Sequence, residues 1–182
     1  MSDPQSNETP PSPAETRFTA LQEAIKNYGA AAFENLIRCK GLADAIVKGF
    51  PDYIGCTQNC VKAVPPVGDF DPRKDYGDQA FSYAHRQVIA LEPVQFGVAL
   101  TIKNFEDSGS LWLRTSIAIE VTGDSFDIFV AQQPVLHAPL EYKGALDPVH
   151  EAIYQEFLRT FKVQVLAFND KRFETGIGFL PS

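Results

Sequence analysis

The alternation of large apolar and smaller or polar side chains between Val94 and Val130 constrains the fold of this chain more than any other feature. Large apolar residues, interrupted only at Thr115, occupy every second position of three consecutive runs, 94–102, 111–121 and 126–130. A period of two is the pattern of β-strands that bury one face. The intervening segments, Glu106–Gly109 and Gly123–Asp124, are rich in residues that form hairpin turns. We therefore predict an antiparallel meander.

The lengths of these turns predict which residues face each other. A two-residue loop at Gly123–Asp124 places Ile117 opposite Val130, and a four-residue loop at Glu106–Gly109 places Val98 opposite Ile117. Both registers keep apolar residues opposite apolar residues, whereas a shift by one residue would turn the apolar row to the other face. The two turns therefore support the same sheet.

A fourth strand is predicted upstream of the meander, over Phe81–Leu91 and joined to it through Glu92-Pro93. Its alternation places polar side chains on the apolar face, near Thr115. We predict that four of these groups line a small polar pocket between the sheet and the helices: Tyr83, His85, Gln87 and Thr115. The alternative is that His85 is a hydrogen-bonded, partly buried histidine near a sheet edge.

Helical periodicity flanks the predicted sheet on both sides. Ser12-Pro13-Ala14-Glu15 has the pattern of a capping box, and an apolar stripe with intervals of three and four follows it, formed by Phe18, Leu21, Ile25 and Tyr28. We expect Gly29 and Gly41 to end or bend this helical region, which continues over 30–40 and 42–48. A last helix begins at Asp147-Pro148, with apolar residues at 149, 153, 157 and 161.

These elements predict an α+β domain with N-terminal helices, a four-stranded antiparallel β-meander and a C-terminal helix packed on the sheet, all around one core. Residues 1–11 are polar and small, and we predict a disordered tail there, followed by a single domain over 12–182. The segment 51–79 has no sustained period and forms a long connection. Residues 163–168 are compatible with a last strand or with the end of the helix.

Composition excludes several classes of protein. The 182 residues carry a net charge of −7, which argues against a nucleic-acid partner or an anionic membrane surface. We find no run of 18 apolar residues, the length that a membrane-spanning helix requires. An odd number of cysteines, three, without an export signal at the first residues predicts a cytoplasmic location. The alternative is secretion with one disulfide and one free thiol, which requires an export route that the sequence does not show.

The remaining motifs predict neither a cofactor nor a metal ion. Cys56 and Cys60 are separated by three residues, whereas redox pairs and zinc knuckles use two, so we expect ordinary thiols. The segment Asp69–Asp78 has four acidic residues but does not match a calcium loop, and we expect a solvated loop. The three histidines have no zinc-peptidase spacing, and we find no nucleophile elbow, phosphate-binding loop or dinucleotide fingerprint.

Two classes of function fit this sequence. The first is a non-enzymatic binding or adaptor module, chaperone-like in one form, that binds a partner protein or itself. It would act through the outer face of the sheet, where Trp112 and Phe129 are predicted to lie, unless a helix covers them. The alternative is a small-molecule-binding protein or enzyme with its site around His85. A closed core under the sheet favours the first class, and an open cavity at Tyr83, His85 and Gln87 favours the second.

Overall fold

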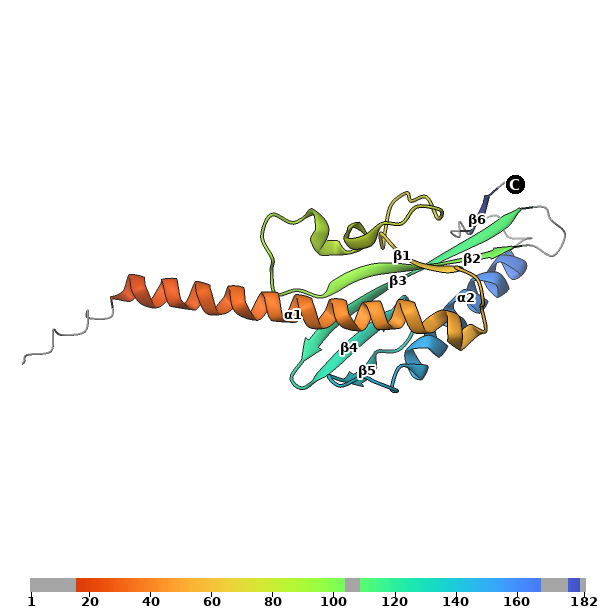
Figure 1. Cartoon of the computed structure of the whole chain (residues 1–182). Helices are drawn as coiled ribbons and strands as arrows, with labels where there is room; N and C mark the ends of the chain where they lie inside the picture. Colours follow the sequence, from red (N-terminus) through yellow and green to blue (C-terminus); the bar gives the residue numbers. More distant parts are fainter. Residues whose placement is uncertain (1–15, 104–108, 168–176, 181–182) are drawn as a thin grey trace, which may run out of the picture.

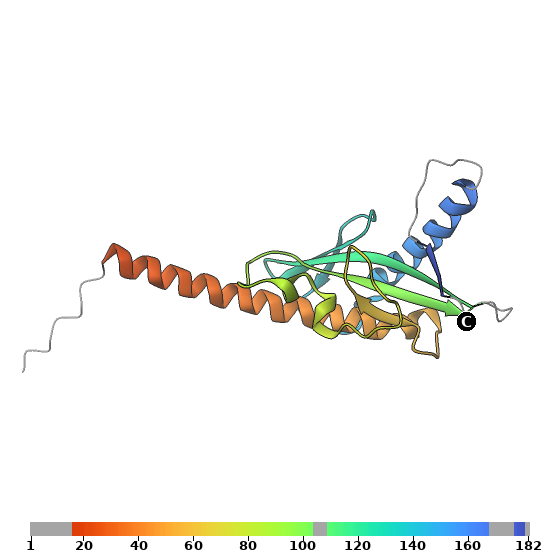
Figure 2. The same ribbon diagram turned by 90° about the horizontal axis from the view of Figure 1, so that it is seen from above.

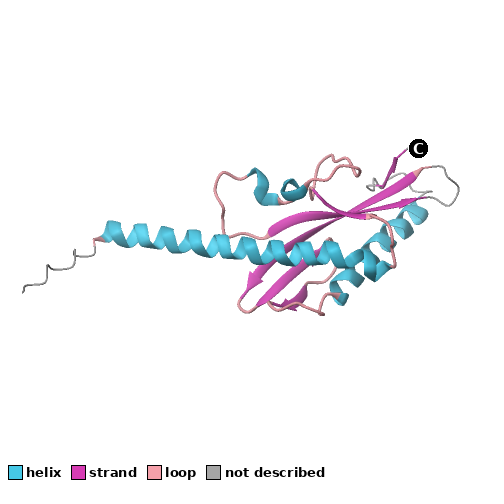
Figure 3. Ribbon diagram, in the orientation of Figure 1, coloured by secondary structure: helices cyan, strands magenta, loops and turns pink. Residues whose placement is uncertain are grey.

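The chain folds into an α+β structure in which two helices and one antiparallel sheet share a core (Figures 1 and 3). The computed structural model describes residues 16–103, 109–167 and 177–180, so the predicted tail at 1–11 lies outside the described residues. The helices are α1 (Arg17–Ile54) and α2 (Asp147–Ala167). The strands are β1 (Val61–Val64), β2 (Val94–Lys103), β3 (Ser110–Thr122), β4 (Ser125–Val130), β5 (Leu136–Pro139) and β6 (Ile177–Leu180).

The sheet has the order β1-β2-β3-β4-β5, and β6 pairs with the start of β3. The fold class is therefore as predicted, although the path holds five strands rather than four. The additional strand is the short β5, which pairs with β4.

The register of the meander confirms one predicted turn and corrects the other. Ile117 lies opposite Val130, as the two-residue turn at Gly123 requires. Val98, however, lies opposite Thr115 rather than Ile117, because Lys103 pairs with Ser110 and the connection is longer than the predicted 106–109. A shift by two residues returns every side chain to its original face, so the apolar row of β3 remains in the core.

The predicted strand over Phe81–Leu91 is wrong. This segment holds the second of two 3-10 turns, η1 (Gly77–Ala80) and η2 (Ser82–His85), and then an irregular loop. β1 lies where this strand was predicted, on the free edge of β2, and pairs with it from Gly97 to Leu100. Only a single bridge, Phe81 to Phe96, joins the predicted strand to β2.

The predicted breaks in the N-terminal helix are also wrong, because α1 is continuous through Gly29, Gly41 and Pro51. A glycine inside a helix costs about 1 kcal/mol, which tertiary packing readily exceeds. The helix begins after Thr16, whose hydroxyl accepts a hydrogen bond from the Thr19 backbone, and the predicted cap at Ser12 lies outside the described residues. It ends at Gly55, which has the left-handed conformation.

The core lies between the helices and alternate residues of β2, β3 and β4. Its largest fully buried side chains come from all of these elements: Leu42, Ile46, Phe50, Phe96, Leu113, Ile117, Ile119, Phe126, Ile128 and Ile153. The predicted C-terminal helix is confirmed, and it continues to Ala167, which rules out a strand over 163–167. The N-terminal half of α1 extends past the edge of the sheet and lies outside the domain body (Figures 1 and 2).

Candidate interaction surface

The N-terminal half of α1 carries an apolar stripe that the protein itself leaves exposed. The side chains of Phe18, Leu21, Ile25 and Tyr28 are 67%, 62%, 71% and 49% exposed, respectively. This half of the helix protrudes from the body of the domain, as the view from above shows (Figure 2). A row of large apolar side chains on a protruding element makes this stripe a candidate interaction surface.

The stripe continues the face by which α1 packs on its own sheet. Ala32, Cys39 and Ile46 follow Phe18 and Ile25 at intervals of seven, and all three are fully buried. A repeat of seven keeps residues on one side of a helix. One face therefore lies against the core beyond Ala32 and is exposed before it.

Between residues 18 and 32, charge is kept away from this face, and Arg17 at the first position of the helix lies beside it. Glu23 and Lys26 are the charged residues of the segment 18–32, and at 100° per residue both lie on the other side of the helix. Ala24 and Ala31 flank the stripe. A surface with few charged residues and with exposed aromatic side chains is typical of the centre of protein interfaces.

A loop next to Tyr28 enlarges the apolar surface. The Leu91 backbone N–H donates a hydrogen bond to the Tyr28 hydroxyl at 3.0 Å, and Asn35 Nδ2 donates to the Glu92 carbonyl at 3.2 Å. These bonds hold the loop against α1, with the side chains of Val88 and Leu91 75% and 54% exposed. We call Phe18, Leu21, Ile25, Tyr28, Val88 and Leu91 the helix–loop surface.

The three residues of the predicted pocket whose side chains the structure describes lie in different surroundings. Thr115 is buried in the sheet, and its hydroxyl has no hydrogen-bond partner in the described structure. Tyr83 is half-buried at η2, whereas Gln87 is exposed on the loop. The cleft beside Tyr83 has a volume of about 10 Å³, room for about one water molecule. The side chain of His85 lies outside what the structure describes.

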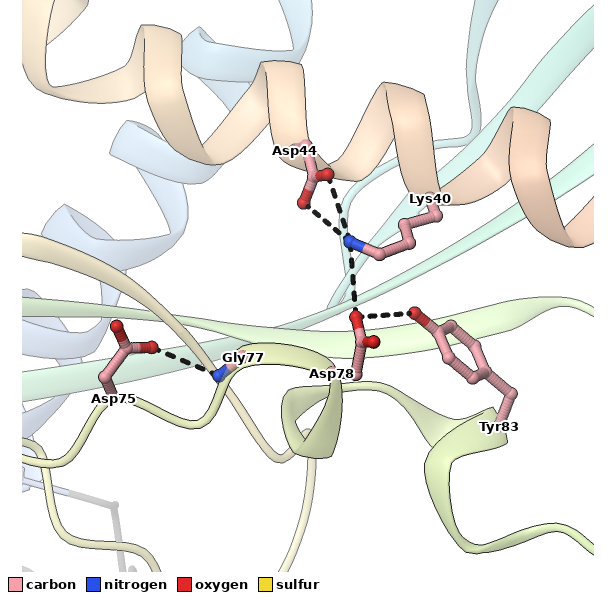
Figure 4. Close-up of polar contacts among 6 residues, drawn as sticks. All are labelled: Lys40, Asp44, Asp75, Gly77, Asp78 and Tyr83. Atoms are coloured by element: carbon pink, nitrogen blue, oxygen red, sulfur yellow. Dashed lines mark hydrogen bonds and ion pairs between the residues drawn. The ribbon is translucent and has the colours of Figure 1, made fainter.

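Tyr83 instead joins a polar cluster that connects η1 and η2 to α1 (Figure 4). Lys40 Nζ lies 3.1 Å from Asp44 Oδ2 and 3.4 Å from Asp78 Oδ1, and the Tyr83 hydroxyl donates to Asp78 at 3.4 Å. Lys40 also lies 5.0 Å from the centre of the Phe81 ring. These contacts hold the 3-10 turns against the helix, which is a structural role.

The electrostatics of the cluster follow from its geometry. Burial and the nearby Asp78 carboxylate raise the pKa of Tyr83, so its hydroxyl stays protonated and continues to donate. Partial burial opposes the charge of Lys40, but hydrogen bonds and charges from Asp44 and Asp78 outweigh it and raise the pKa of Lys40. Neither group is poised to exchange protons near neutral pH.

The outer face of the sheet is covered at Trp112 by a loop rather than by a helix. The Phe70 ring packs edge-on against Trp112, with 4.8 Å between ring centres, and the Arg114 guanidinium lies 4.6 Å from the centre of the Phe70 ring. Arg114 Nη1 also donates to the Gly68 carbonyl at 2.8 Å. Phe129 is half-buried on β4. Trp112 is therefore less available to a partner than the helix–loop surface.

Within the part of the chain that the structure describes, histidines and acidic residues do not gather into a metal site. His137 Nδ1 lies 2.7 Å from Asp127 Oδ1 on the exposed side of β4 and β5, whereas His150 is buried between the helices. Among the described residues, no three side chains of the metal-binding types lie close enough to hold an ion. In the same part of the chain, no helix has the length and apolarity needed to cross a membrane.

The prediction of ordinary thiols is wrong for two of the three cysteines. Cys56 and Cys60 form a disulfide directly after α1, and Cys39 is free and buried. A spacing of three residues differs from that of redox motifs, and the sequence therefore did not predict a disulfide. The turn after Gly55 reverses the chain before β1 and brings the two cysteines together. Burial raises the pKa of the Cys39 thiol to about 11, which leaves it unreactive.

The sequence identified the stripe of α1 and predicted N-terminal helices around one core, but it did not predict that this stripe is exposed. An amphipathic pattern shows that a helix has an apolar face, and does not show what covers that face. The signal that was available is length: apolar positions over 18–54 span a helix of roughly 55 Å at 1.5 Å per residue. The strands that follow have at most 13 residues, and a helix of this length extends beyond such a sheet.

Comparisons with protein-family models, with curated proteins and with solved structures found no match to this chain.

Proposed function

We propose that this protein is a non-enzymatic binding module that docks other polypeptides on its helix–loop surface. The exposed stripe on the protruding half of α1 carries this proposal: apolar side chains that are 49–71% exposed and lie in a row, on a face without charged residues from 18 to 32. Exposing such a row to water is unfavourable, at roughly 25 cal/mol per Å² of apolar surface. A partner that covers the row recovers this free energy.

The small-molecule alternative has less support. It requires a cavity at Tyr83 and its neighbours, and the cleft there holds about one water molecule. Larger hollows, such as the cleft of about 370 Å³ between α1 and Leu91, are open and lined by polar and apolar groups in similar measure. Ligand pockets usually enclose most of the ligand and are mainly apolar.

Photo-crosslinking in cells tests the proposal. A photoreactive amino acid replaces Ile25 in the stripe, or Ile37 as a matched control, because Ile37 is 55% exposed on another face of α1. We expect discrete crosslinked protein bands from position 25 that are absent from position 37 and that disappear with Leu21→Glu. A chain that gives no protein crosslink from position 25 would contradict the proposal.

The compartment decides whether the disulfide persists. We predicted the cytoplasm from the odd number of cysteines, but glutathione and thioredoxin keep most cytosolic thiols reduced. The Cys56–Cys60 bond therefore favours an oxidising compartment. Alkylation of the protein in intact cells separates the two: cysteines that react place the chain in the cytoplasm, and a protected pair places it in an oxidising compartment.

A further inference from the structure

We infer that the occupant of the helix–loop surface is a second copy of this chain, and that two α1 helices pack antiparallel over residues 18–28 in a symmetric dimer. This inference rests on the proposed function, because it names the partner of the same surface.

The spacing of the stripe makes it complementary to itself. Phe18, Leu21, Ile25 and Tyr28 follow intervals of three, four and three, the a and d positions of a heptad repeat. In an antiparallel pair, Phe18 of one copy lies opposite the partner's Tyr28, and Leu21 lies opposite the partner's Ile25. The twofold axis generates the same two layers again. Four apolar layers result, and no charged side chain lies in them.

The body of the domain determines the direction of the pairing. Beyond Ala32 the same face of α1 is covered by the chain's own core. A parallel partner would place both domain bodies on this face at the same end of the pair, where they would collide. In an antiparallel pair, the two domain bodies lie at opposite ends. Each helix then contacts only the protruding half of its partner (Figure 2).

The loop at 88–91 gives the partner's helix a second contact. Because Leu91 is hydrogen-bonded to Tyr28, the exposed side chain of Leu91 lies beside the end of the stripe, and the exposed Val88 precedes it by three residues on the same loop. The antiparallel arrangement places the partner's Phe18 at Tyr28. Its ring therefore meets both the helix and the loop.

The area of the surface suits a weak, specific dimer. Aromatic side chains such as Phe18 and Tyr28 offer about 150–250 Å² each, and Leu21 and Ile25 are somewhat smaller, so the exposed fractions amount to roughly 500 Å² on the stripe of each copy. With the loop, the pair reaches the low end of specific interfaces, near 1,200 Å² in total. We therefore expect micromolar dissociation and a strong dependence on concentration.

Sedimentation equilibrium of the full chain, purified alone, tests this inference. The average mass should rise from one chain to two between low micromolar and several hundred micromolar concentrations. Replacing Leu21 and Ile25 with glutamate should leave a monomer at every concentration. The matched control replaces Phe33 and Ile37 with glutamate, since these residues are 53% and 55% exposed but lie about 120° around the helix. The control should dimerise like the original chain.

Disulfide crosslinking tests the direction of the pairing. Ala24 lies beside the twofold axis of the antiparallel pair, so Ala24→Cys should give a crosslinked dimer on mild oxidation, whereas Ala30→Cys on the opposite side of α1 should not. A chain that stays monomeric, a dimer that persists in the Leu21/Ile25 variant, or a dimer without the Ala24 crosslink overturns the inference. If the purified chain is monomeric but Ile25 crosslinks to a different protein in cells, the binding function stands and the dimer does not.

Discussion

The contact between α1 and α2 depends on one glycine and one histidine. His150 is buried, and its Nε2 lies 3.1 Å from the Ile46 carbonyl oxygen. The rings of Phe50 and Tyr53 lie next to it, with 6.0 and 5.5 Å between ring centres. Gly49 has no side chain, and this absence leaves the space that the imidazole fills.

Replacing Gly49 with alanine should destabilise the fold. The added Cβ would lie 2.8 Å from His150 Cε1, closer than real Cβ contacts. Overpacking of this kind costs about 1–3 kcal/mol, which chemical denaturation measures. Gly29→Ala is the matched control, because it lies in the same helix with no atom within 4 Å of the added Cβ. The control should gain up to about 1 kcal/mol from helix propensity. Equal effects at both positions would contradict the packing described here.

His150 should make stability depend on pH. Burial lowers its pKa below the usual value, although the hydrogen bond to Ile46 opposes the shift. The unfolded chain therefore takes up this proton first, and the free energy of unfolding should fall as the pH drops below about 6.5. Denaturation curves at pH 7.5 to 5 measure the slope. His150→Gln keeps a donor for the Ile46 carbonyl but does not titrate, so its slope over this range should be flatter.

At the scale of elements, β3 is the centre of the sheet because β2, β4 and β6 all pair with it. Ile117 lies in its middle, 1% exposed, between Phe96 and Val130 of the neighbouring strands.

Ile117→Ala should cost about 2–5 kcal/mol, through lost burial and the cavity that remains. The neighbouring Ser116 is exposed on the other face, and Ser116→Ala should change stability by less than about 0.5 kcal/mol. Urea denaturation of the two variants measures both effects. A cost below 1 kcal/mol at Ile117 would mean that the faces are exchanged.

The disulfide connects the end of α1 to the start of β1. Because it closes a loop of only a few residues, chain entropy assigns it about 2 kcal/mol. Replacing both Cys56 and Cys60 with serine should therefore lower the melting temperature while leaving the far-UV circular dichroism spectrum unchanged. Loss of the folded spectrum at room temperature would show that the bond is required for folding.

At the scale of the whole molecule, the protein is a closed body from which one helix protrudes. The body holds the core, whereas the stripe of α1 contributes nothing to it. The residues that stabilise the fold are therefore different from the residues of the exposed apolar row.

This separation predicts that the stripe can change without unfolding the body. Replacing Leu21 and Ile25 with glutamate should change the free energy of unfolding by less than about 1 kcal/mol, because exposed substitutions usually have small effects. Thermal denaturation at a low protein concentration, where the chain is monomeric, measures this. A large loss of stability would show that the stripe packs on the chain's own body.

The local pattern of the chain determined its strands and their faces. Alternation and the turn at Gly123 predicted that Ile117, Ile119 and Phe126 lie in the core, and they do. The C-terminal helix was predicted from Asp147 for the same reason, since periodicity and capping act between residues close in sequence.

The tertiary structure determined which elements are neighbours. Two segments could pair with the same edge of β2, because each offers backbone N–H and C=O groups. Residues 61–64 pair with this edge, whereas the predicted strand at 81–91 makes a single bridge to it. Tyr142 and His150 pack so closely beside Gly41 and Gly49 that an added Cβ would lie 3.3 Å from the Tyr142 hydroxyl and 2.8 Å from His150 Cε1. The stripe at Phe18 is exposed because the sheet ends before the helix does. Periodicity identifies an apolar face, but only the packed fold determines whether the chain itself covers that face.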